Sequence, residues 1–334
     1  MKFWDREREL NWLKRYLQTE PNALLFIYGP KSSGKSTLLQ RVVEELPKSD
    51  FKYYWYDLRE EAITTYSSVL NLFFKEKGWL RRMLEFVSGV VRVNYGAFEL
   101  SGGELIRISK GELNPFSEMR RILEKDRKEG MIPVLVFDEL QKLKEIYLNS
   151  PNNQRPLINE LFNFFVRLTK VLHLSHVIVM TSDTFFIERV YSDSTLESTS
   201  RFYLVDFFDD KTTLKILLEE GLPEKDAEYV IEMAGGVPWI LEEVLEGNPR
   251  EVIEELYELT LSRIYESTRK RRDLKEILKR AVKGENLYYE EEKLDLVKEL
   301  VEKEVLFYDP IGRAVRFQNR LYEHAAREIL KGKN

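Results

Sequence analysis

A glycine-rich octapeptide between an apolar run and a helical pattern constrains the fold of this chain more than any other feature. Residues 29–36 read Gly-Pro-Lys-Ser-Ser-Gly-Lys-Ser and match the pattern G-x-x-x-x-G-K-S/T. The apolar run 23–28 precedes the octapeptide as an expected buried strand, and residues 37–43 follow it with helical spacing. A strand, a glycine-rich turn and a helix in this order predict a phosphate-binding loop (P-loop) in an α/β domain.

The chemistry of such a loop gives its residues their expected roles. Glycines let the backbone wrap closely around a phosphate, and the amides of the loop and of the helix N-terminus supply partial positive charge. The ammonium of Lys35 can reach the β- and γ-phosphates and take part in catalysis, and the hydroxyl of Ser36 can coordinate Mg²⁺. The residues expected to bind the nucleotide are Gly29, Pro30, Lys31, Ser32, Ser33, Gly34, Lys35, Ser36 and Thr37.

A second apolar run, residues 132–137, ends in two carboxylates about a hundred residues after the loop. This is the Walker B pattern. Asp138 is expected to hold Mg²⁺ together with Ser36, directly or through water. Glu139 is expected to polarise the water that attacks the γ-phosphate. Strands that end in solvated acids are common, so the pattern acquires its meaning from the P-loop in the same chain.

Two more residues are candidates for catalysis, each with a structural alternative. Ser182 follows the apolar run 177–180 and could position the attacking water, with Asp183 as the alternate; a helix cap is the other interpretation. Arg201 precedes the apolar run 202–205 and could complete a neighbouring subunit's site as an arginine finger. The alternative for Arg201 is a surface ion pair.

Composition excludes several classes of protein. The chain of 334 residues has no cysteine, which excludes disulfides and thiolate-bound metals and favours a reducing, cytoplasmic location. Its three histidines, His173, His176 and His324, lack the close partners that a zinc site would need. No run of about twenty apolar residues predicts a membrane span, so a membrane partner is not expected.

Alternating apolar runs and helical patterns up to residue 206 predict a parallel sheet covered on both faces. The expected strands are 23–28, 53–58, 134–137, 177–180 and 202–205, and the expected helices are 5–17, 66–83, 115–129 and 157–172. One region interrupts this alternation. Residues 91–95 and 105–108 have strand-like patterns around Gly102 and Gly103, which predicts a β-hairpin insertion at about 86–110.

The remaining chain divides into two further predicted domains. Residues 207–262 contain only helical patterns and predict a helical domain. In residues 263–334, two helical stretches precede two short apolar runs around an Asp-Pro-x-Gly turn at 309–312. Helices followed by a hairpin predict a winged helix. The first domain is accordingly expected to span residues 1–206.

Charge is distributed unevenly along the chain. The net charge is −5, yet residues 263–334 hold 18 Lys and Arg against 14 Asp and Glu. The basic run 269–272, with Arg313 and Arg316 on the expected wing, could bind DNA phosphates without sequence specificity. The acidic run 290–292 argues against DNA, and a protein partner or self-association is the alternative.

Taken together, these motifs resemble the archaeal ATPase family, which is related to the AAA+ and STAND branches of the ASCE P-loop ATPases and, more distantly, to archaeal origin-recognition ATPases. The segments that carry the resemblance are Phe3–Leu10, Tyr28–Ser36, Tyr56–Arg59, Phe137–Gln141, Thr181-Ser182 and Gly235–Pro238. They span most of the chain in the family's order. The resemblance implies an ATPase core, a helical lid at 207–262 and a C-terminal winged helix.

The resemblance also implies positions for three residues outside the P-loop. Asp5 and Arg6 would lie near the adenine, and Pro238 of the lid would pack on the nucleotide. Two features depart from the family pattern. Thr181-Ser182 stands where Gly-Ser is usual, and no arginine closely follows residues 235–238, so the resemblance supplies no lid arginine for the γ-phosphate.

The function expected from these residues is Mg²⁺-dependent binding and hydrolysis of ATP, coupled to movement of the lid and the winged helix. The alternative is a nucleotide-gated switch that holds ATP or ADP with little turnover, possibly in association with DNA. Glu139 favours the enzyme, because a protein that only binds nucleotide does not need that carboxylate. A small-molecule phosphotransferase is disfavoured, because no acceptor-substrate motif is evident.

Overall fold

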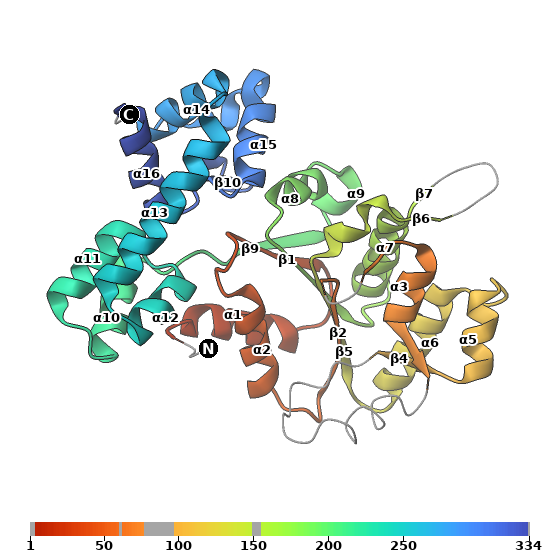
Figure 1. The fold of residues 1–334 in the computed structure, drawn as a ribbon. Coiled ribbons are helices and arrows are strands. Elements are labelled where there is room, and N and C mark those ends of the chain that lie inside the picture. The colour runs from red at the N-terminus through yellow and green to blue at the C-terminus, as the bar shows by residue number, and fades with distance from the viewer. Residues whose placement is uncertain (1–3, 60–61, 77–96, 149–154, 333–334) are drawn as a thin grey trace. The chain divides into compact units, whose positions relative to one another are not determined.

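The computed structural model describes residues 4–59, 62–76, 97–148 and 155–332 (Figure 1). The chain forms two compact units. One, here called the sheet unit, comprises Arg6–Tyr28 and Lys35–Tyr203. The other, here called the lid unit, comprises Met1–Asp5, Gly29–Gly34 and Leu204–Asn334. No helix in the described ranges is both long and apolar enough to cross a membrane.

A five-stranded sheet organises the sheet unit. Its strands lie in the order β2 (Phe51–Asp57), β5 (Ile132–Asp138), β8 (His176–Thr181), β1 (Leu24–Tyr28) and β9 (Ser200–Leu204). The pairs β2–β5, β5–β8 and β8–β1 are all parallel. Because β8 lies between β1 and β5, its carboxyl end separates the P-loop strand from the Walker B strand.

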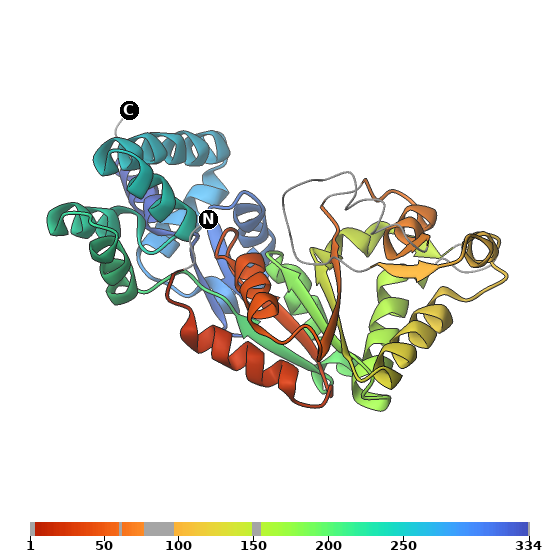
Figure 2. The ribbon, with the colours of Figure 1, turned by 90° about the horizontal axis from the view of Figure 1, so that it is seen from below.

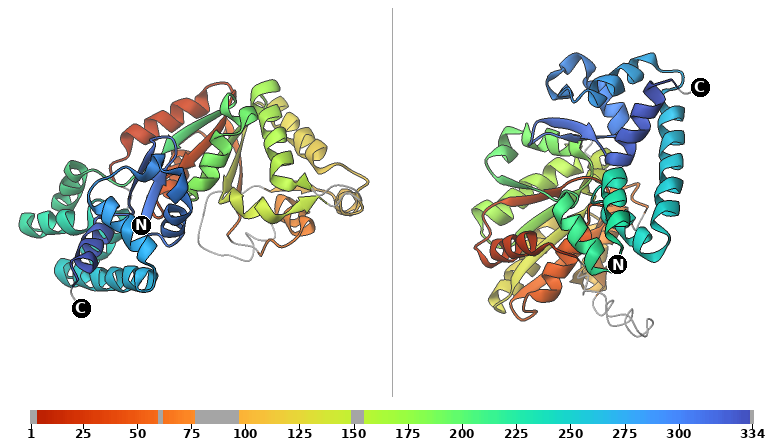
Figure 3. Two further views of the ribbon diagram at one scale, coloured as in Figure 1. Left: turned by 90° about the horizontal axis from the view of Figure 1, so that it is seen from above. Right: turned by 90° about the vertical axis from the view of Figure 1, so that its left-hand side faces the viewer.

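The strands are apolar along their whole length because both faces of the sheet are covered. Every residue of β1 and β8 is buried, which is the burial pattern of a parallel sheet between two layers of helices. The flanking helices include α1 (Glu7–Gln18), α2 (Lys35–Glu45), α6 (Pro115–Lys128), α7 (Leu157–Val166) and α8 (Thr184–Tyr191). Figures 2 and 3 show helices packed along the sheet. The helix predicted over 157–172 continues beyond α7 as a π-helical segment, Arg167–Val171.

Two predictions about the region between β2 and α6 were wrong. The helix expected over 66–83 ends early, because α3 (Tyr66–Phe73) gives way to β3 (Phe74–Glu76), which pairs in parallel with β4 (Phe98–Leu100). Residues 105–108, expected as a strand, belong to the helix α5 (Gly102–Ser109). The other expected strand of that hairpin, 91–95, lies outside the described residues.

Local capping explains why α5 is a helix despite its apolar alternation. The hydroxyl of Ser101 accepts a hydrogen bond from the backbone N–H of Glu104, and the Glu104 carboxylate accepts one from the backbone N–H of Ser101 at 2.8 Å. This reciprocal capping box satisfies two backbone donors at a helix start. The alternation over 105–108 therefore reflects one face of a short helix.

Short elements complete the sheet unit after β5. They are the 3₁₀ helix Leu140–Glu145, the antiparallel pair β6 (Tyr147–Leu148) and β7 (Arg155–Pro156), and the short helix α9 (Ser194–Glu197).

The lid unit begins with four helices, α10 (Asp210–Glu219), α11 (Glu224–Ala234), α12 (Pro238–Glu246) and α13 (Pro249–Thr268). The elements α14 (Arg272–Val282), α15 (Leu294–Glu302), β10 (Leu306–Asp309), β11 (Ala314–Phe317) and α16 (Arg320–Leu330) follow. The antiparallel β10–β11 hairpin after two helices forms the predicted winged helix. The predicted boundary between residues 262 and 263 lies inside α13, and the domain boundaries stay a prediction.

One hydrophobic core joins the two parts of the lid unit. Leu321 of α16 is buried in the same cluster as Leu217 of α10, Val230 of α11 and Ile253 of α13. Burying one side chain of this size stabilises a fold by about 1.5–3 kcal/mol. The last helix of the winged helix therefore packs as part of the lid.

Candidate nucleotide-binding site

The P-loop, residues 29–34, connects β1 to α2 and adopts a backbone that requires glycine. Gly29 has φ +153° and Gly34 has φ +88°. A Cβ on Gly29 would lie 2.2 Å from the carbonyl oxygen of Val205, closer than any real contact. The loop therefore packs tightly on the segment that leads into the lid, and both belong to the lid unit.

Lys35, the first residue of α2, is buried in the sheet unit. Burial lowers the pKa of its ammonium group to about 8, whereas the carboxylates of Glu139 and Asp138 act in the opposite direction. A cation with so little hydration gains strongly from an anionic ligand. This position suits the predicted contact of Lys35 with phosphate.

The structure brings together the two predicted metal ligands. The hydroxyl of Ser36 donates a hydrogen bond to Oδ2 of Asp138 at 2.8 Å. Burial raises the pKa of the Asp138 carboxyl to about 6, against the opposing influence of Arg59 and of the Ser36 hydrogen bond. A hydroxyl and a carboxylate side by side are hard oxygen ligands of the kind Mg²⁺ prefers, so these residues fit the ion.

Within the described ranges, no group of three or more His, Cys, Asp or Glu side chains could hold a metal. In nucleotide sites, Mg²⁺ is usually held by one or two protein oxygens, and phosphates and water complete the shell.

Glu139 is held in a defined position by its backbone and by two side chains. Its φ of 61° lies in the left-handed region, which is uncommon for a residue with a Cβ and is a form of strain concentrated at functional sites. Its backbone N–H donates to the carbonyl oxygen of Met180 at 2.9 Å. The hydroxyl of Ser182 donates to Oε1 of Glu139 at 3.0 Å. The amide of Gln141 donates to the other carboxylate oxygen.

Gln141 and Thr181 belong to this network, although the sequence analysis assigned neither of them a role. The Thr181 hydroxyl donates to Oε1 of Gln141 at 2.9 Å, which fixes the orientation of the Gln141 amide. The signal was present in the sequence, because both residues lie in motifs that carry the family resemblance. Asp183, the alternate to Ser182, instead caps α8 through the backbone N–H of Phe186 and pairs with Lys144 at 2.7 Å.

Arg59 is a further member of the cluster that the sequence analysis did not single out. Its Nη2 lies 2.6 Å from Oδ2 of Asp138 and 2.9 Å from Oδ2 of Asp57. The register of β2 and β5 places Asp57 directly beside Asp138. The sequence signal for Arg59 was its place in the segment Tyr56–Arg59. This segment includes the end of β2, the strand that neighbours the Walker B strand β5.

A model of the ATPase domain found predominantly in Archaea matches residues 3–244. The chain belongs to this archaeal ATPase family. An uncharacterized ATP-binding protein of Methanocaldococcus jannaschii is 38% identical over 348 aligned residues, with 99% of this chain and 95% of that protein covered. Another, from Pyrococcus abyssi, is 36% identical over 346 residues, with 98% of each chain covered.

Among solved structures, the ADP form of the Aeropyrum pernix ORC2 protein aligns with a TM-score of 0.53 and 12% identity. The alignment covers 99% of this chain and 97% of that one. At this identity the likeness shows the fold alone. It confirms the predicted α/β P-loop fold with a C-terminal winged helix in this member of the family.

Arg201 does not join the cluster around Glu139. It is exposed near the amino end of β9, and its positive charge partly offsets the rise that burial causes in the pKa of the Tyr16 phenol. The hydroxyl of Tyr16 donates to the carbonyl oxygen of Ala23, which precedes β1. Arg201 therefore lies toward the amino-terminal edge of the sheet, whereas the phosphate site lies at the carboxyl edge. Its predicted action on a neighbouring subunit stays a prediction.

The residues expected near the base have contacts of their own in the structure. Asp5 pairs with Lys215 of α10 at 3.2 Å, and the buried Arg6 pairs with Glu9 at 3.0 Å. Pro238 is buried as the first residue of α12. The contacts of Asp5, Arg6 and Pro238 with the nucleotide stay predictions.

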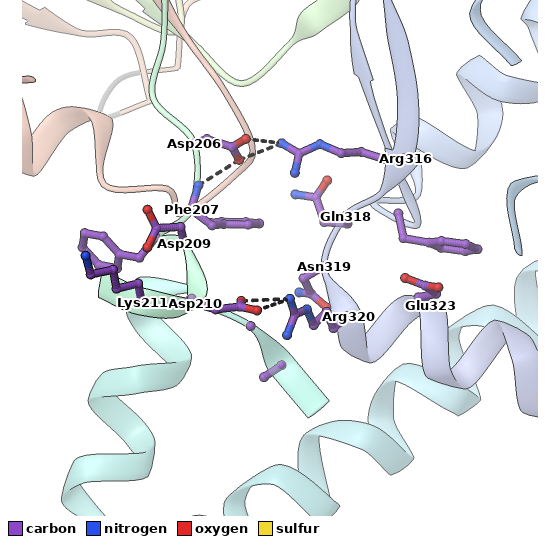
Figure 4. A pocket seen from close by; sticks show the side chains of 15 residues that line it. Asp206, Phe207, Asp209, Asp210, Lys211, Arg316, Gln318, Asn319, Arg320 and Glu323 are labelled. Atoms are coloured by element: carbon purple, nitrogen blue, oxygen red, sulfur yellow. Dashed lines mark hydrogen bonds and ion pairs between the residues drawn. The ribbon is translucent and has the colours of Figure 1, made fainter. Parts of the chain in front are cut away.

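The wing arginine Arg316 lies in a pocket of about 690 Å³ inside the lid unit. Its guanidinium pairs with Asp206 at 2.6 Å, and Arg320 pairs with Asp210 at 2.8 Å (Figure 4). These two ion pairs, here called the clasp, connect the start of the lid to the end of the winged helix. Arg316 is consequently paired with a carboxylate of its own chain, although its side chain is 43% exposed.

Arginines of the basic tail also contact nearby carboxylates. Arg269 pairs with Glu266, Arg271 with Asp273 and Glu299, and Arg280 with Glu285 and Glu290. Much of the positive charge that suggested DNA binding is therefore neutralised locally. This arrangement weakens the DNA hypothesis without testing it.

Proposed function

We propose that this chain is a magnesium-dependent ATPase that couples hydrolysis to movement of the lid and the winged helix. The observation that carries the proposal is the position of Glu139. Its carboxylate is fixed by Ser182 and Gln141 in the same unit as the Ser36–Asp138 pair and the buried Lys35. Membership of the archaeal ATPase family supports it.

Each side chain has a defined task in this mechanism. Lys35 and the loop amides bind the β- and γ-phosphates, and Ser36 and Asp138 hold the ion. When bound, Mg²⁺ supplies positive charge that offsets the charge developing on the phosphates. Glu139 orients the attacking water and accepts its proton. Ser182 and Gln141 keep the Glu139 carboxylate from rotating away.

The coupling rests on contacts between the phosphate-binding loop and the rest of the lid unit. Gly29 packs on the carbonyl of Val205, at the start of the segment that leads into α10. Lys31 of the loop pairs with Glu304, just before β10, at 2.5 Å, and Arg263 of α13 lies 3.5 Å from the same carboxylate. A loop that rearranges around phosphate would therefore act directly on the lid segment and on the winged helix.

The second candidate is a nucleotide-gated switch with little turnover. The observation in its favour is the ion pair between Arg59 and Asp138, since it engages the carboxylate that the ATPase needs for its metal. The two candidates differ in rate. Steady turnover above about one per minute indicates the enzyme, and tightly retained ADP with slower turnover indicates the switch.

The test is steady-state ATP hydrolysis with Mg²⁺ and with EDTA. Glu139→Gln should keep ATP binding and lose about a hundredfold or more in kcat, because the amide accepts no proton from water. Glu145→Gln is the matched control. Glu145 is an exposed glutamate at the end of the 3₁₀ helix Leu140–Glu145, which directly follows Glu139. A Glu139→Gln variant that hydrolyses ATP at the wild-type rate would refute the assignment of the base.

DNA binding through residues 263–334 belongs to this proposal as a separate arm. If it occurs, affinity for a labelled duplex should fall steeply between about 50 and 200 mM salt, by counterion release. Replacing Arg313 and Arg316 should weaken it on every sequence. Absence of binding at low salt, with ATP and with ADP, would assign the winged helix to a protein partner or to self-association.

A further inference from the structure

Arg59 is a half-exposed cation that reaches a buried carboxylate. Its side chain is 50% exposed, whereas that of its partner Asp138 is only 3% exposed. The guanidinium also holds Asp57 through Nε and Nη2, both at 2.9 Å. One arginine thus connects the acids that end two neighbouring strands, β2 and β5.

Arg59 contacts the same carboxylate oxygen of Asp138 that accepts the hydrogen bond from Ser36, the other expected metal ligand. Oδ2 of Asp138 lies 2.6 Å from Nη2 of Arg59 and accepts the hydrogen bond from Ser36 at 2.8 Å. Ser36 and Asp138 are the side chains that fit Mg²⁺. A guanidinium and a metal ion that share one carboxylate oxygen repel each other, so the two cations compete for it.

Asp57 provides a second attachment for the arginine. Besides the two guanidinium contacts, the backbone N–H of Arg59 donates to Oδ1 of Asp57 at 2.9 Å. Asp57 is more accessible than Asp138, with a side chain 21% exposed. The guanidinium can release Asp138 and stay bound to Asp57, so a small side-chain rotation would separate the two states.

We propose that Arg59 is a built-in counter-ion of Asp138 that closes the magnesium position while the site lacks nucleotide. Mg²⁺ then enters only with a nucleotide, whose phosphates supply further oxygen ligands and offset the charge of the displaced guanidinium. This proposal rests on the magnesium site of the proposed function. It assigns Arg59 as a positioning residue that controls the order of binding, with no part in bond cleavage.

The experiment uses Mn²⁺ as a probe for Mg²⁺. Binding of Mn²⁺ to the full-length, nucleotide-free protein is measured from the electron paramagnetic resonance signal of the free ion. Arg59→Gln should bind Mn²⁺ at least about tenfold more tightly than the wild type, because one competing charge is removed. Arg59→Lys should bind it with wild-type-like weakness. Adding Asp138→Asn to Arg59→Gln should abolish the gain.

Arg121→Gln is the matched control. Arg121 is 55% exposed and also contacts two carboxylates, Glu118 at 2.7 Å and Glu104 at 3.0 Å, away from the nucleotide site. Its replacement should leave Mn²⁺ affinity unchanged. A purely structural role for Arg59 would lower the melting temperature of Arg59→Gln without raising its Mn²⁺ affinity, and that result would overturn the proposal.

A second measurement separates this inference from the proposed function. Mn²⁺ binding is repeated with a saturating, non-hydrolysable ATP analogue. If Mn²⁺ binds the wild type in neither condition, the magnesium site itself fails. If Mn²⁺ binds the wild type with the analogue, but Arg59→Gln gains nothing without it, only the counter-ion role fails. Should Arg59→Gln not fold, Arg59→Met supplies the same charge removal and is read by the same criteria.

Discussion

Two regions of this chain concentrate charge, and they differ in burial. At the carboxyl edge of the sheet, Lys35 and Asp138 are buried, and burial moves the pKa of both toward neutrality. In the winged-helix region, Arg269 and Arg271 lie at the surface beside acidic partners, with side chains 48% and 40% exposed. Buried charges are costly without a partner and therefore poised to bind one, whereas exposed pairs are screened and add little. A dense basic run in the sequence thus says less about function than two acids at the end of a buried strand.

Removing the buried ammonium should have the largest effect. Lys35→Ala should weaken ATP binding by about a hundredfold or more, because it deletes a charged donor from a site of low dielectric. Isothermal titration with ATP and Mg²⁺ measures this. Lys48→Ala, an exposed lysine after α2, is the control. An affinity for Lys35→Ala within about threefold of wild type, well under 1 kcal/mol, would contradict the P-loop assignment.

Gln141→Ala should have the next largest effect, on rate rather than on binding. Without the Gln141 amide, the Glu139 carboxylate is held by Ser182 alone, so kcat should fall by about tenfold as the base loses its orientation. The affinity for ATP should stay unchanged, and Gln141→Glu should not restore the rate because its carboxylate repels Glu139. The exposed Gln18 provides the control variant. A changed affinity with an unchanged kcat would place Gln141 outside the catalytic network.

The pKa of Lys35 predicts a smaller effect, the uptake of less than one proton on ATP binding. Burial lowers the folded-state pKa to about 8 from the ordinary 10.5, so unliganded protein stability should rise with pH between these values, where the unfolded chain holds more protons. Bound phosphate favours the protonated ammonium. At a pH of about 8.5, part of the Lys35 amine is deprotonated in the free protein, so ATP binding should be accompanied by proton uptake at Lys35. Calorimetry in buffers of different ionisation enthalpy measures the uptake, and Lys35→Met should abolish it.

The clasp is made of exposed ion pairs, so removing a charge from it should have the smallest effect on stability. Arg320 and Asp210 are both more than one third exposed, so Asp210→Asn, which leaves the hydrogen bond from Arg320 to the carbonyl oxygen of Ile231 in place, should destabilise the fold by less than about 1 kcal/mol after solvent screening. Urea unfolding at low and at high salt measures this, and the difference should vanish at high salt. A large, salt-independent loss would show that the clasp behaves like the buried cluster rather than like the surface pairs.

Much of the fold and of the phosphate site could be predicted from local patterns. The apolar runs marked the strands of the sheet, because strands buried on both faces have few polar residues. The P-loop and the two acids at the end of β5 were recognisable because their chemistry requires particular residues at fixed spacing. The strand expected at 105–108 failed for a local reason, since the capping box at Ser101 and Glu104 overrides the alternation that follows it.

Sequence by itself determined the strands of the central sheet, the phosphate-binding loop and the two acids at the end of β5, because each depends on neighbours in the chain. Tertiary structure alone decided that Arg59 pairs with Asp138 and Arg316 with Asp206, which lie 79 and 110 residues away in the chain. It also decided that β8 separates β1 from β5 and so brings Ser182 to Glu139. Local sequence patterns do not predict these contacts. The sequence gives the charge of a side chain, but the packing of strands and helices determines which oppositely charged residue lies beside it.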